Sequence, residues 1–368
     1  MRSPKILILD TYYADFVRQV YRHRPNLASQ LYVEQLQTFL NEHFGTGDSY
    51  SHYLKQLGYD AHDVIADNVT LQYQWAKEHG LTVRSWPHLP WLGQYTDRLP
   101  LYKILEAQIA AFQPDILYCQ NLTFCDPLFL KKLKRRVKLV VGQIACPLSP
   151  TPFLKPFDLI LTSFPHFVPK LNGLGIQAEY FKIGFEERLL PLLTDVTEKK
   201  YDVVFIGGFS KVHQPNTVLL EQLAAEIPID VWGYGIETRP AHSPLRQHYH
   251  GEAWAMDMYR IIKQAKICIN RHSSAAEDNA NNMRLFETTG LGTCLITDAK
   301  QNLNELFTIG KEVVCYSSAA ELIETVQHYL GHDTERETIA QAGQARTLRD
   351  HTYHQRMVEL DGILKKYV

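Results

Sequence analysis

The chain has 368 residues, of which 45% are hydrophobic and 21% charged, and its formal net charge at pH 7 is −2. At roughly 100–200 residues per domain, this length predicts two globular domains, each with its own core. A chain so close to neutrality lacks the basic field that gathers nucleic acid or anionic lipid, so we expect neither as a partner.

The first residues and the cysteines favour a cytoplasmic protein. Residues 1–10, MRSPKILILD, hold a short apolar run that falls well below a signal-peptide core, and no later stretch approaches the roughly 18 apolar residues of a membrane span. The six cysteines form no C-x-x-C pair, and several lie in apolar runs such as AKICIN and TCLITD. We therefore expect buried, reduced thiols.

Short apolar runs alternate with helix-length segments along the whole chain. Such runs, rich in Val, Ile and Leu, predict a parallel sheet that helices cover on both faces. The first series comprises residues 5–10, 59–67, 114–120, 137–144, 157–163 and 178–184, and the second comprises residues 201–208, 229–235, 265–271, 293–299 and 312–318.

Two series of strands predict two domains. We expect an N-terminal domain over residues 1–185, a polar linker over 186–200, a C-terminal domain over 201–352, and a last helix over 353–368 that can return to the N-terminal domain. The predicted fold class is α/β, with two doubly wound Rossmann-like domains facing a central cleft. Open α/β sheets bind ligands at the carboxyl ends of their strands, so function is expected there.

Several common motifs are missing from the sequence. There is no G-x-G-x-x-G, D-x-D, H-E-x-x-H or G-x-S-x-G. Their absence removes support for an ordinary dinucleotide site, a metal-bound diphosphate held by paired aspartates, a zinc peptidase and an α/β-hydrolase. We therefore expect no metal and no cofactor.

A glycine-containing loop, GGFSKVHQPN, follows the first strand of the second series. Gly207 and Gly208 let the backbone approach a bound group, and the amides at the start of the next helix favour an anion such as a diphosphate. Lys211 and His213 add positive charge. The alternative is a simple strand-to-helix turn that needs glycine for its dihedral angles.

The segment NANNMRLFETTG predicts a helix that starts near Asn282, because asparagine is a good N-cap residue. Arg284 in the first turn can reach a phosphate, and Glu287 can accept two hydrogen bonds from the hydroxyls of a ribose. The alternative is an i, i+3 ion pair on an exposed helix face, which stabilises a helix by only a few tenths of a kcal/mol.

The same segment carries a resemblance to a known family. The pattern N-x-R-x-F-E-x-x-x-x-G, a later strand near GKEVVCY and the closing R-x-L-x-x-H-T-Y-x-x-R are similar to the C-terminal half of the CgeB-like (spore maturation protein-like) glycosyltransferases, over roughly residues 200–360. The resemblance implies a metal-independent hexosyltransferase of GT-B fold. It also implies a nucleotide-sugar donor in the second domain and an acceptor of unknown kind, whether glycan, protein or small molecule, in the first.

The resemblance also implies roles for single residues of the second domain. Glu287 takes the ribose, Arg284 and the Gly207–Gly208 loop take the diphosphate, and Asn282 approaches the donor phosphate or sugar. The remaining donor-binding candidates lie at strand ends, either to stack on the base or to face the donor, although the two aromatic ones suit a core equally well: Trp232, Tyr234, Arg271 and His272.

The first domain is expected to supply the acceptor contacts and any catalytic base. Asp10 ends the first strand, and Asp48 and His52 lie in the loop FGTGDSYSHYL. A carboxylate or imidazole within reach of an acceptor hydroxyl can act as a general base. Asp48 is equally well placed to be an N-cap and His52 a half-buried helix residue, and a retaining enzyme needs no protein base.

Two other functions remain open. An isomerase similar to the nucleotide-sugar 2-epimerases shares the architecture and the ribose-binding logic, but it would convert the donor without any acceptor. A non-catalytic envelope or spore protein would bind nucleotide without turnover.

Overall fold

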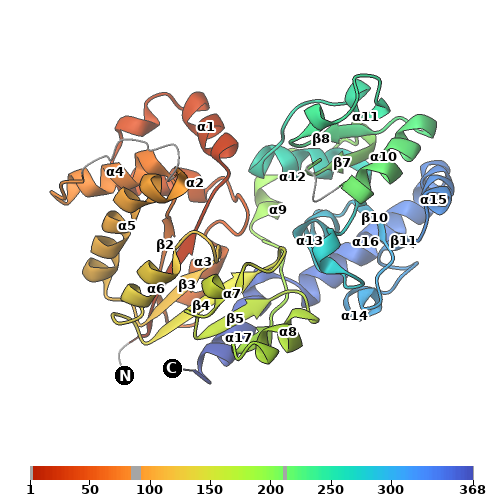
Figure 1. The fold of residues 1–368 in the computed structure, drawn as a ribbon. Coiled ribbons are helices and arrows are strands. Elements are labelled where there is room, and N and C mark those ends of the chain that lie inside the picture. Colours follow the sequence, from red (N-terminus) through yellow and green to blue (C-terminus); the bar gives the residue numbers. More distant parts are fainter. Residues whose placement is uncertain (1–2, 84–92, 210–213, 368) are drawn as a thin grey trace. The chain divides into compact units, whose positions relative to one another are not determined.

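The computed structural model describes residues 3–83, 93–209 and 214–367. The chain folds as two compact units (Figure 1). Unit 1 comprises Met1–Phe181 and Met357–Val368, and unit 2 comprises Lys182–Arg356. The segment 186–200 lies within unit 2 and carries a short helix, and the last helix of the chain ends in unit 1.

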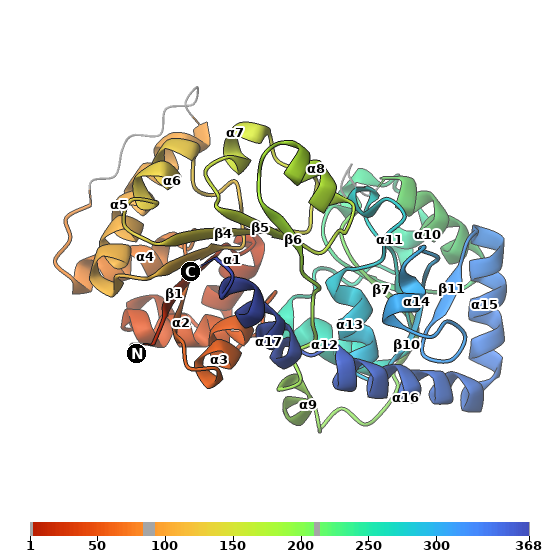
Figure 2. The ribbon, with the colours of Figure 1, turned by 90° about the horizontal axis from the view of Figure 1, so that it is seen from below.

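Unit 1 is built on a six-stranded sheet in the order β2-β1-β3-β4-β5-β6, all parallel. Helices cover both faces of the sheet, with α6, α7 and α8 on one side and α3 and α17 on the other (Figure 2). Its elements are β1 (Lys5–Asp10), α1 (Ala14–His23), α2 (Tyr32–Leu40), α3 (Ser49–Gln56), β2 (Asp60–Ile65), α4 (Val69–Glu78), α5 (Gly93–Phe112), β3 (Ile116–Cys119), α6 (Pro127–Leu133), β4 (Leu139–Ile144), α7 (Thr151–Leu154), β5 (Leu159–Thr162), α8 (Phe167–Gly173), β6 (Ala178–Tyr180) and most of α17 (Tyr353–Leu364).

Unit 2 is built on a five-stranded parallel sheet in the order β11-β10-β9-β7-β8. Its core joins the apolar residues of β7, β9 and β10 to those of α10 and α15. Its elements are α9 (Leu189–Leu192), β7 (Tyr201–Ile206), α10 (Gln214–Glu226), β8 (Asp230–Trp232), α11 (Pro244–Gln247), α12 (Ala255–Gln264), β9 (Ala265–Asn270), α13 (Met283–Gly290), β10 (Cys294–Asp298), α14 (Leu303–Leu306), β11 (Val314–Tyr316), α15 (Ala319–Gly331) and α16 (Asp333–Asp350).

The predicted α/β class with parallel sheets is confirmed, and each of the eleven predicted apolar runs contains a strand. In unit 1, β2 pairs on one side of β1 and β3 pairs on the other side. In unit 2, β8 pairs on one side of β7 and β9 pairs on the other side. The strand order therefore reverses between β1 and β3 and between β7 and β9. A crevice forms at such a switch point, beyond the carboxyl ends of the two strands.

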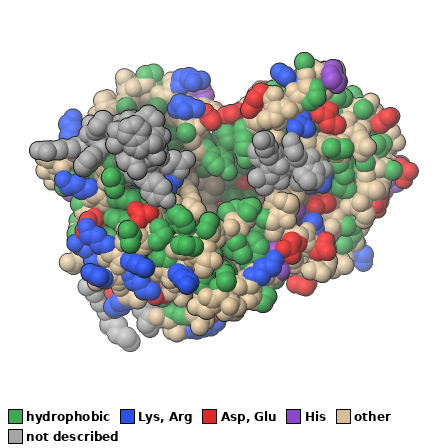
Figure 3. Space-filling model, viewed as in Figure 1, with side chains coloured by type: hydrophobic (Ala, Val, Ile, Leu, Met, Phe, Trp, Pro, Cys, Tyr) green, Lys and Arg blue, Asp and Glu red, His purple; other side chains and the backbone are tan. Residues whose placement is uncertain are grey.

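The basic run KKLKRRVK, residues 131–138, lies at the end of α6. Lys and Arg side chains gather over the part of unit 1 where α6 lies (Figure 3). Lys132 and Arg136 both pair with Glu106, at 2.6 Å and 2.9 Å, and Lys134 pairs with Asp158. The basic run KKLKRRVK is therefore a helix end whose positive charge is offset in part by two carboxylates. Across the described ranges, none of the helices is long and apolar enough to cross a bilayer.

Candidate functional site

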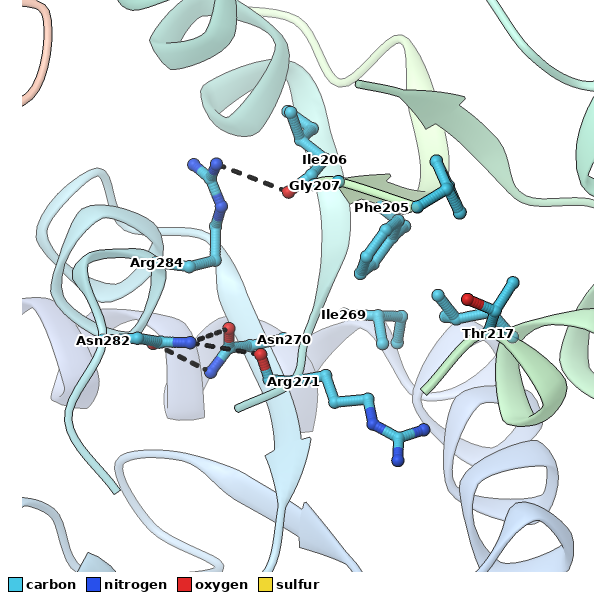
Figure 4. A pocket seen from close by; sticks show the side chains of 12 residues that line it. Phe205, Ile206, Gly207, Thr217, Ile269, Asn270, Arg271, Asn282 and Arg284 are labelled. Carbon is cyan, nitrogen blue, oxygen red and sulfur yellow. Dashed lines mark hydrogen bonds between the residues drawn. The ribbon is translucent and has the colours of Figure 1, made fainter. Parts of the chain in front are cut away.

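A pocket of about 160 Å³ lies at the switch point of unit 2, where β7 and β9 end. Its walls come from the glycine loop after β7, the end of β9 and the first turn of α13 (Figure 4). These elements are far apart in the sequence, and the parallel pairing of β7 with β9 brings them together. The lining residues are Phe205, Ile206, Gly207, Gly208, Phe209, Thr217, Leu220, Ile269, Asn270, Arg271, Asn282 and Arg284.

Glycine at the end of β7 allows an unusually close approach of neighbouring groups. A Cβ atom on Gly208 would lie 2.5 Å from the ring of Tyr234, so that ring packs directly on the glycine backbone. The Tyr234 ring is also stacked on Trp254, with centroids 6.0 Å apart. The close packing explains why glycine is needed here, and it leaves the Gly207–Gly208 backbone as part of the pocket wall.

Helix α13 begins as predicted. The Asn282 side chain accepts a hydrogen bond from the Leu285 amide at 3.1 Å, and it is therefore the N-cap. The same side chain exchanges two hydrogen bonds with Asn270 at the end of β9, and its Nδ2 also donates to the Arg271 carbonyl oxygen. The side-chain oxygen and nitrogen of Asn282 both make hydrogen bonds within the chain, and these bonds hold the start of α13 against the end of β9.

Arg284 and Glu287 form an ion pair at 2.8 Å. The Arg284 guanidinium also reaches the Ile206 carbonyl oxygen at 3.4 Å (Figure 4). It lies 2.9 Å from the Met258 sulfur as well. The structural alternative predicted an ion pair on an exposed helix face. The ion pair is present, but the face is not exposed, because Glu287 is only 6% exposed. Burial raises the pKa of Glu287, and the Arg284 charge opposes this shift.

One donor of Arg284 has no protein partner. Its Nε atom is buried and makes no hydrogen bond. A buried unpaired donor of a charged group is costly, so an acceptor in the pocket would stabilise this guanidinium. Arg284 lines the pocket, whereas Glu287 is not among the described lining residues and pairs with the guanidinium.

The other predicted donor-binding residues are placed differently. Arg271 lines the pocket. His272 is buried, and its Nδ1 lies 2.7 Å from a carboxylate oxygen of Asp298. Trp232 is 6% exposed and packs on Tyr201 and on the ring of an exposed histidine, as its core alternative predicts. His213 lies outside the described residues.

A second pocket, of about 360 Å³, lies at the switch point of unit 1. It contains Asp10, whose Oδ1 accepts a hydrogen bond from the Thr11 amide at 2.7 Å. Asp48 and His52 do not line this pocket. Asp48 occupies the N-cap position of α3, without a side-chain capping bond, and the His52 Nε2 lies 3.0 Å from the side-chain nitrogen of Gln56.

The carboxyl group of Asp10 is a weaker acid than that of an ordinary aspartate. Burial is the main reason that its pKa is raised from 3.8 to about 7, and the charges of Asp67 and Asp63 add to the shift, whereas the Thr11 amide opposes it. Between about pH 4 and pH 7, the Asp10 carboxyl group is therefore protonated in the folded protein but ionised in the unfolded chain. By linkage, this residue makes the free energy of unfolding fall as the pH rises through that window.

Asp10→Asn is expected to remove this dependence. The difference in unfolding free energy between the variant and the wild type should grow from about pH 4 to pH 7 in favour of the variant, by at most about 4 kcal/mol. Partial exposure of the side chain reduces this limit. Denaturant melts of both proteins across the window measure the difference, and a constant difference would mean that Asp10 titrates normally.

Metal-binding side chains do not cluster in the described part of the chain. Nowhere within it do three or more His, Cys, Asp or Glu side chains come together as a metal site requires. The chain itself supplies positive groups near the unit 2 pocket, among them Arg284, Arg271 and the N-terminal amides of α13.

Comparison with known proteins identifies the architecture. Residues 216–362 match the model of a family described as glycosyl transferase-like. HepE from Anabaena, solved in complex with UDP-glucose, is 13% identical, with a TM-score of 0.62 over 98% of this chain and 99% of that one. The chain has the GT-B fold.

Two further solved structures of this fold resemble the whole chain. Sucrose-phosphate synthase from Thermosynechococcus elongatus is 11% identical, with a TM-score of 0.60 over 99% of this chain and 98% of that one. AviGT4, a glycosyltransferase involved in avilamycin A biosynthesis, is 10% identical, with a TM-score of 0.57 over 99% and 98%. No curated protein matches the sequence. The family model and the fold together support a glycosyltransferase, without distinguishing the CgeB-like group.

Several residues of the two pockets were not anticipated from the sequence. In unit 2 these include Thr217, and Met258, outside the lining, contacts Arg284 through its sulfur. In unit 1 they are Asn121 and Gln143, which come from the ends of β3 and β4. The signal that marks Gln143 is a lone amide in the apolar run VKLVVGQI, because a strand buried on both faces rarely keeps a polar side chain without a purpose.

Proposed function

We propose that the chain is a cytoplasmic, metal-independent glycosyltransferase of the CgeB-like group, which moves a hexosyl residue from a nucleoside diphosphate sugar to an acceptor hydroxyl. The observation that carries the proposal is the unit 2 pocket, where Arg284 presents a buried Nε without a partner beside a glycine loop and a helix N-terminus. This combination of donors suits a diphosphate.

In the proposed reaction, unit 2 stabilises the leaving group, which is the nucleoside diphosphate. As the acceptor oxygen bonds to the anomeric carbon, the bond from that carbon to the diphosphate oxygen breaks, and negative charge grows on the diphosphate. Arg284, the backbone amide of Gly208 and the first amides of α13 are fixed in place before the reaction, so they stabilise that charge without reorganising, whereas the Gly207 amide is already bonded to the Trp232 carbonyl oxygen. Such groups take the part that a divalent ion plays elsewhere.

Glu287 is proposed to accept hydrogen bonds from the ribose hydroxyls while one of its oxygens keeps Arg284 in position. Tyr234, half-buried over Gly208, is the better placed of the two aromatic candidates to stack on the base, because Trp232 is taken up by core contacts. Arg271 supplies further positive charge at the pocket wall. His272 is assigned a positioning role through Asp298.

Unit 1 is proposed to bind the acceptor and, in an inverting reaction, to accept the proton of its hydroxyl. Asp10 is the leading candidate base because it lines the pocket and has a pKa of about 7, close to the pH at which it must take up a proton. Asp48 and His52 remain secondary candidates, since they do not line that pocket.

Glu287→Gln tests the donor site. Because the substitution removes a charge and converts one acceptor oxygen into a donor, we expect donor affinity to fall about ten- to a hundred-fold, or roughly 1.5–3 kcal/mol. The remaining oxygen can still accept from Arg284, so stability should fall by only about 1 kcal/mol. Calorimetric titration with UDP, GDP, TDP and their sugars, beside melting curves, measures both quantities.

Glu324→Gln is the matched control, since Glu324 lies on the exposed face of α15 in the same unit. Unchanged nucleotide affinity in the Glu287 variant would exclude that residue as the ribose ligand. Incubation with donor alone separates the remaining possibilities: a changed sugar without acceptor indicates an isomerase, and tight binding without turnover on any acceptor indicates a non-catalytic protein.

A further inference from the structure

The unit 1 pocket is lined by a distinctive set of side chains. Amide and hydroxyl groups predominate, one carboxyl group is present, and none of the described lining residues is Lys, Arg or His. Amides and hydroxyls both donate and accept hydrogen bonds, as the hydroxyls of a sugar do. The residues with polar side chains are Asp10, Thr11, Gln120, Asn121, Thr123, Gln143, Cys146 and Ser149.

Gln143 is held in one orientation. Its Oε1 accepts hydrogen bonds from the hydroxyls of Tyr50, at 3.0 Å, and Tyr118, at 2.7 Å. Both tyrosines are buried, with 1% and 0% exposure. Since two donors already use that oxygen, the amide nitrogen is the group that Gln143 offers to the pocket it lines.

A second amide is fixed in a similar way. The Asn121 Oδ1 accepts from both the backbone amide and the hydroxyl of Thr123, and its Nδ2 donates to the Thr11 hydroxyl at 2.9 Å. This network orients the Thr11 and Thr123 hydroxyls around the pocket. Side chains locked by such bonds are preorganised for a ligand rather than free to rearrange.

The electrostatics of the pocket favour neutral over anionic ligands. Among the described lining residues the one ionisable acid is Asp10, with Asp67 and Asp63 close enough to raise its pKa further. No Arg or Lys is among those residues to pair with a phosphate or carboxylate, and the nearby Arg98 guanidinium donates to the Thr123 and Phe124 carbonyl oxygens. The volume of about 360 Å³ is at the small end of the range of roughly 300–1,000 Å³ for small-molecule sites, which suits one ring better than a chain segment.

We infer that the acceptor of this protein is an uncharged saccharide, and that its terminal ring binds between Asn121 and Gln143 at the switch point of unit 1. The inference rests on the proposed glycosyl transfer and names the acceptor class, together with two residues that determine it. Asp10, in the same pocket, lies where an acceptor hydroxyl would have to lose its proton.

Cys146 provides a direct readout of occupancy. It lines the pocket and is exposed, whereas four of the other five cysteines are buried and Cys315 is half-buried. Partial desolvation raises the pKa of the Cys146 thiol and lowers the fraction of reactive thiolate, while its exposure leaves the sulfur accessible to the reagent. Mass spectrometry of the Cys146 peptide after timed iodoacetamide treatment of the full chain therefore reports a ligand in this pocket.

The probes are neutral mono- and disaccharides, the 6-phosphates of the same sugars, and a Ser/Thr-containing peptide. We expect a neutral saccharide to slow Cys146 alkylation at least several-fold, while its phosphate and the peptide leave the rate unchanged. Protection by sugar phosphates or by the peptide instead, or protection by none of the probes, would overturn the inference.

Gln143→Glu is the decisive variant. Glutamate keeps an oxygen for the two tyrosine hydroxyls and replaces only the NH₂ donor, so the fold should survive while protection by saccharides falls by about ten-fold or more. Gln177→Glu adds the same charge at an exposed position of unit 1 and should leave protection intact. Full protection in the Gln143 variant would exclude it as an acceptor ligand.

Nucleotide titration separates this inference from the proposed function. UDP binding depends on unit 2 and is measured by calorimetry, without reference to Cys146. Normal UDP binding with no saccharide protection would overturn the acceptor assignment alone, whereas saccharide protection in a chain that binds no nucleotide would overturn the donor assignment alone.

Discussion

Arg284→Met is expected to lower the affinity for nucleoside diphosphates at least a hundred-fold, or about 2.7 kcal/mol. The guanidinium is a charged donor in the wall of the unit 2 pocket, as is that of Arg271, and the buried Nε of Arg284 makes no hydrogen bond. Methionine has a similar length and can keep the packing against Met258, so the loss reports the missing charge-assisted hydrogen bonds. Calorimetric titration with UDP measures the change.

The same substitution should also destabilise the fold. Glu287 is 6% exposed, and without Arg284 its carboxylate is left buried and unpaired, which typically costs about 3–5 kcal/mol. An unpaired buried carboxyl group favours its neutral form, so its pKa rises further. The stability deficit of the variant is therefore expected to be smaller at pH 5 than at pH 8.

The double variant Arg284→Met, Glu287→Met separates the two effects. Removing both charges leaves no unpaired ion, so stability should return close to that of the wild type. Nucleotide affinity should stay low, because the group that donates to the diphosphate and the group that accepts from the ribose hydroxyls are both missing. If affinity returns with stability, the pair is purely structural and the donor site lies elsewhere.

The fold was largely predictable from the sequence because buried parallel strands are continuous apolar runs. Each predicted run contains a strand, although the strands are often shorter: the run 178–184 holds β6 only over Ala178–Tyr180, and the run 229–235 holds β8 only over Asp230–Trp232. Apolar residues beyond the paired strand serve loops and helix packing, so hydrophobicity alone does not locate the end of a strand.

The surroundings of α13 show where sequence reasoning stopped. The Asn282 cap was predictable from local chemistry, but the burial of Glu287 was not. Helix α16, from a distant part of the chain, packs against α13, and the Thr289 and Thr347 hydroxyls lie 2.6 Å apart across that contact. Periodicity within eight residues does not reveal which neighbour covers a helix face.

The pocket of unit 1 was the least predictable feature. Asp10 was found because it ends an obvious strand, but Asn121 and Gln143 acquire meaning only from the order of β1, β3 and β4 in the sheet. The orientation of Gln143 depends on Tyr50, which precedes it by 93 residues. Long-range contacts of this kind are set by topology rather than by any local pattern.

Gly233→Ala is expected to lower the free energy of unfolding by more than about 4 kcal/mol, because two independent effects act at this position. Gly233 has a φ of +139°, a conformation that costs an L-residue about 1–3 kcal/mol. A Cβ atom there would also lie 1.8 Å from the Gly207 carbonyl oxygen, which is a backbone atom that no rotamer change can move.

Relief of that clash requires the ends of β7 and β8 to separate. The Gly207 amide bonds to the Trp232 carbonyl oxygen at 3.0 Å, and the Tyr249 hydroxyl bonds to the Gly233 carbonyl oxygen at 2.7 Å, so both contacts would be strained. The displaced residue, Gly207, is part of the diphosphate wall. Nucleotide binding should therefore be lost along with stability.

Gly331→Ala is the control for this variant. Gly331 ends α15 in the same unit, its φ is not positive, and an added Cβ would meet nothing within 4 Å. Alanine there should leave nucleotide binding unchanged and shift stability by no more than about 1 kcal/mol, in the favourable direction. Thermal melts and UDP titrations of the two variants decide the matter: a Gly233 variant that melts and binds like the wild type would mean that the glycine loop can move freely, and a loop that moves freely cannot supply preorganised amides to a diphosphate.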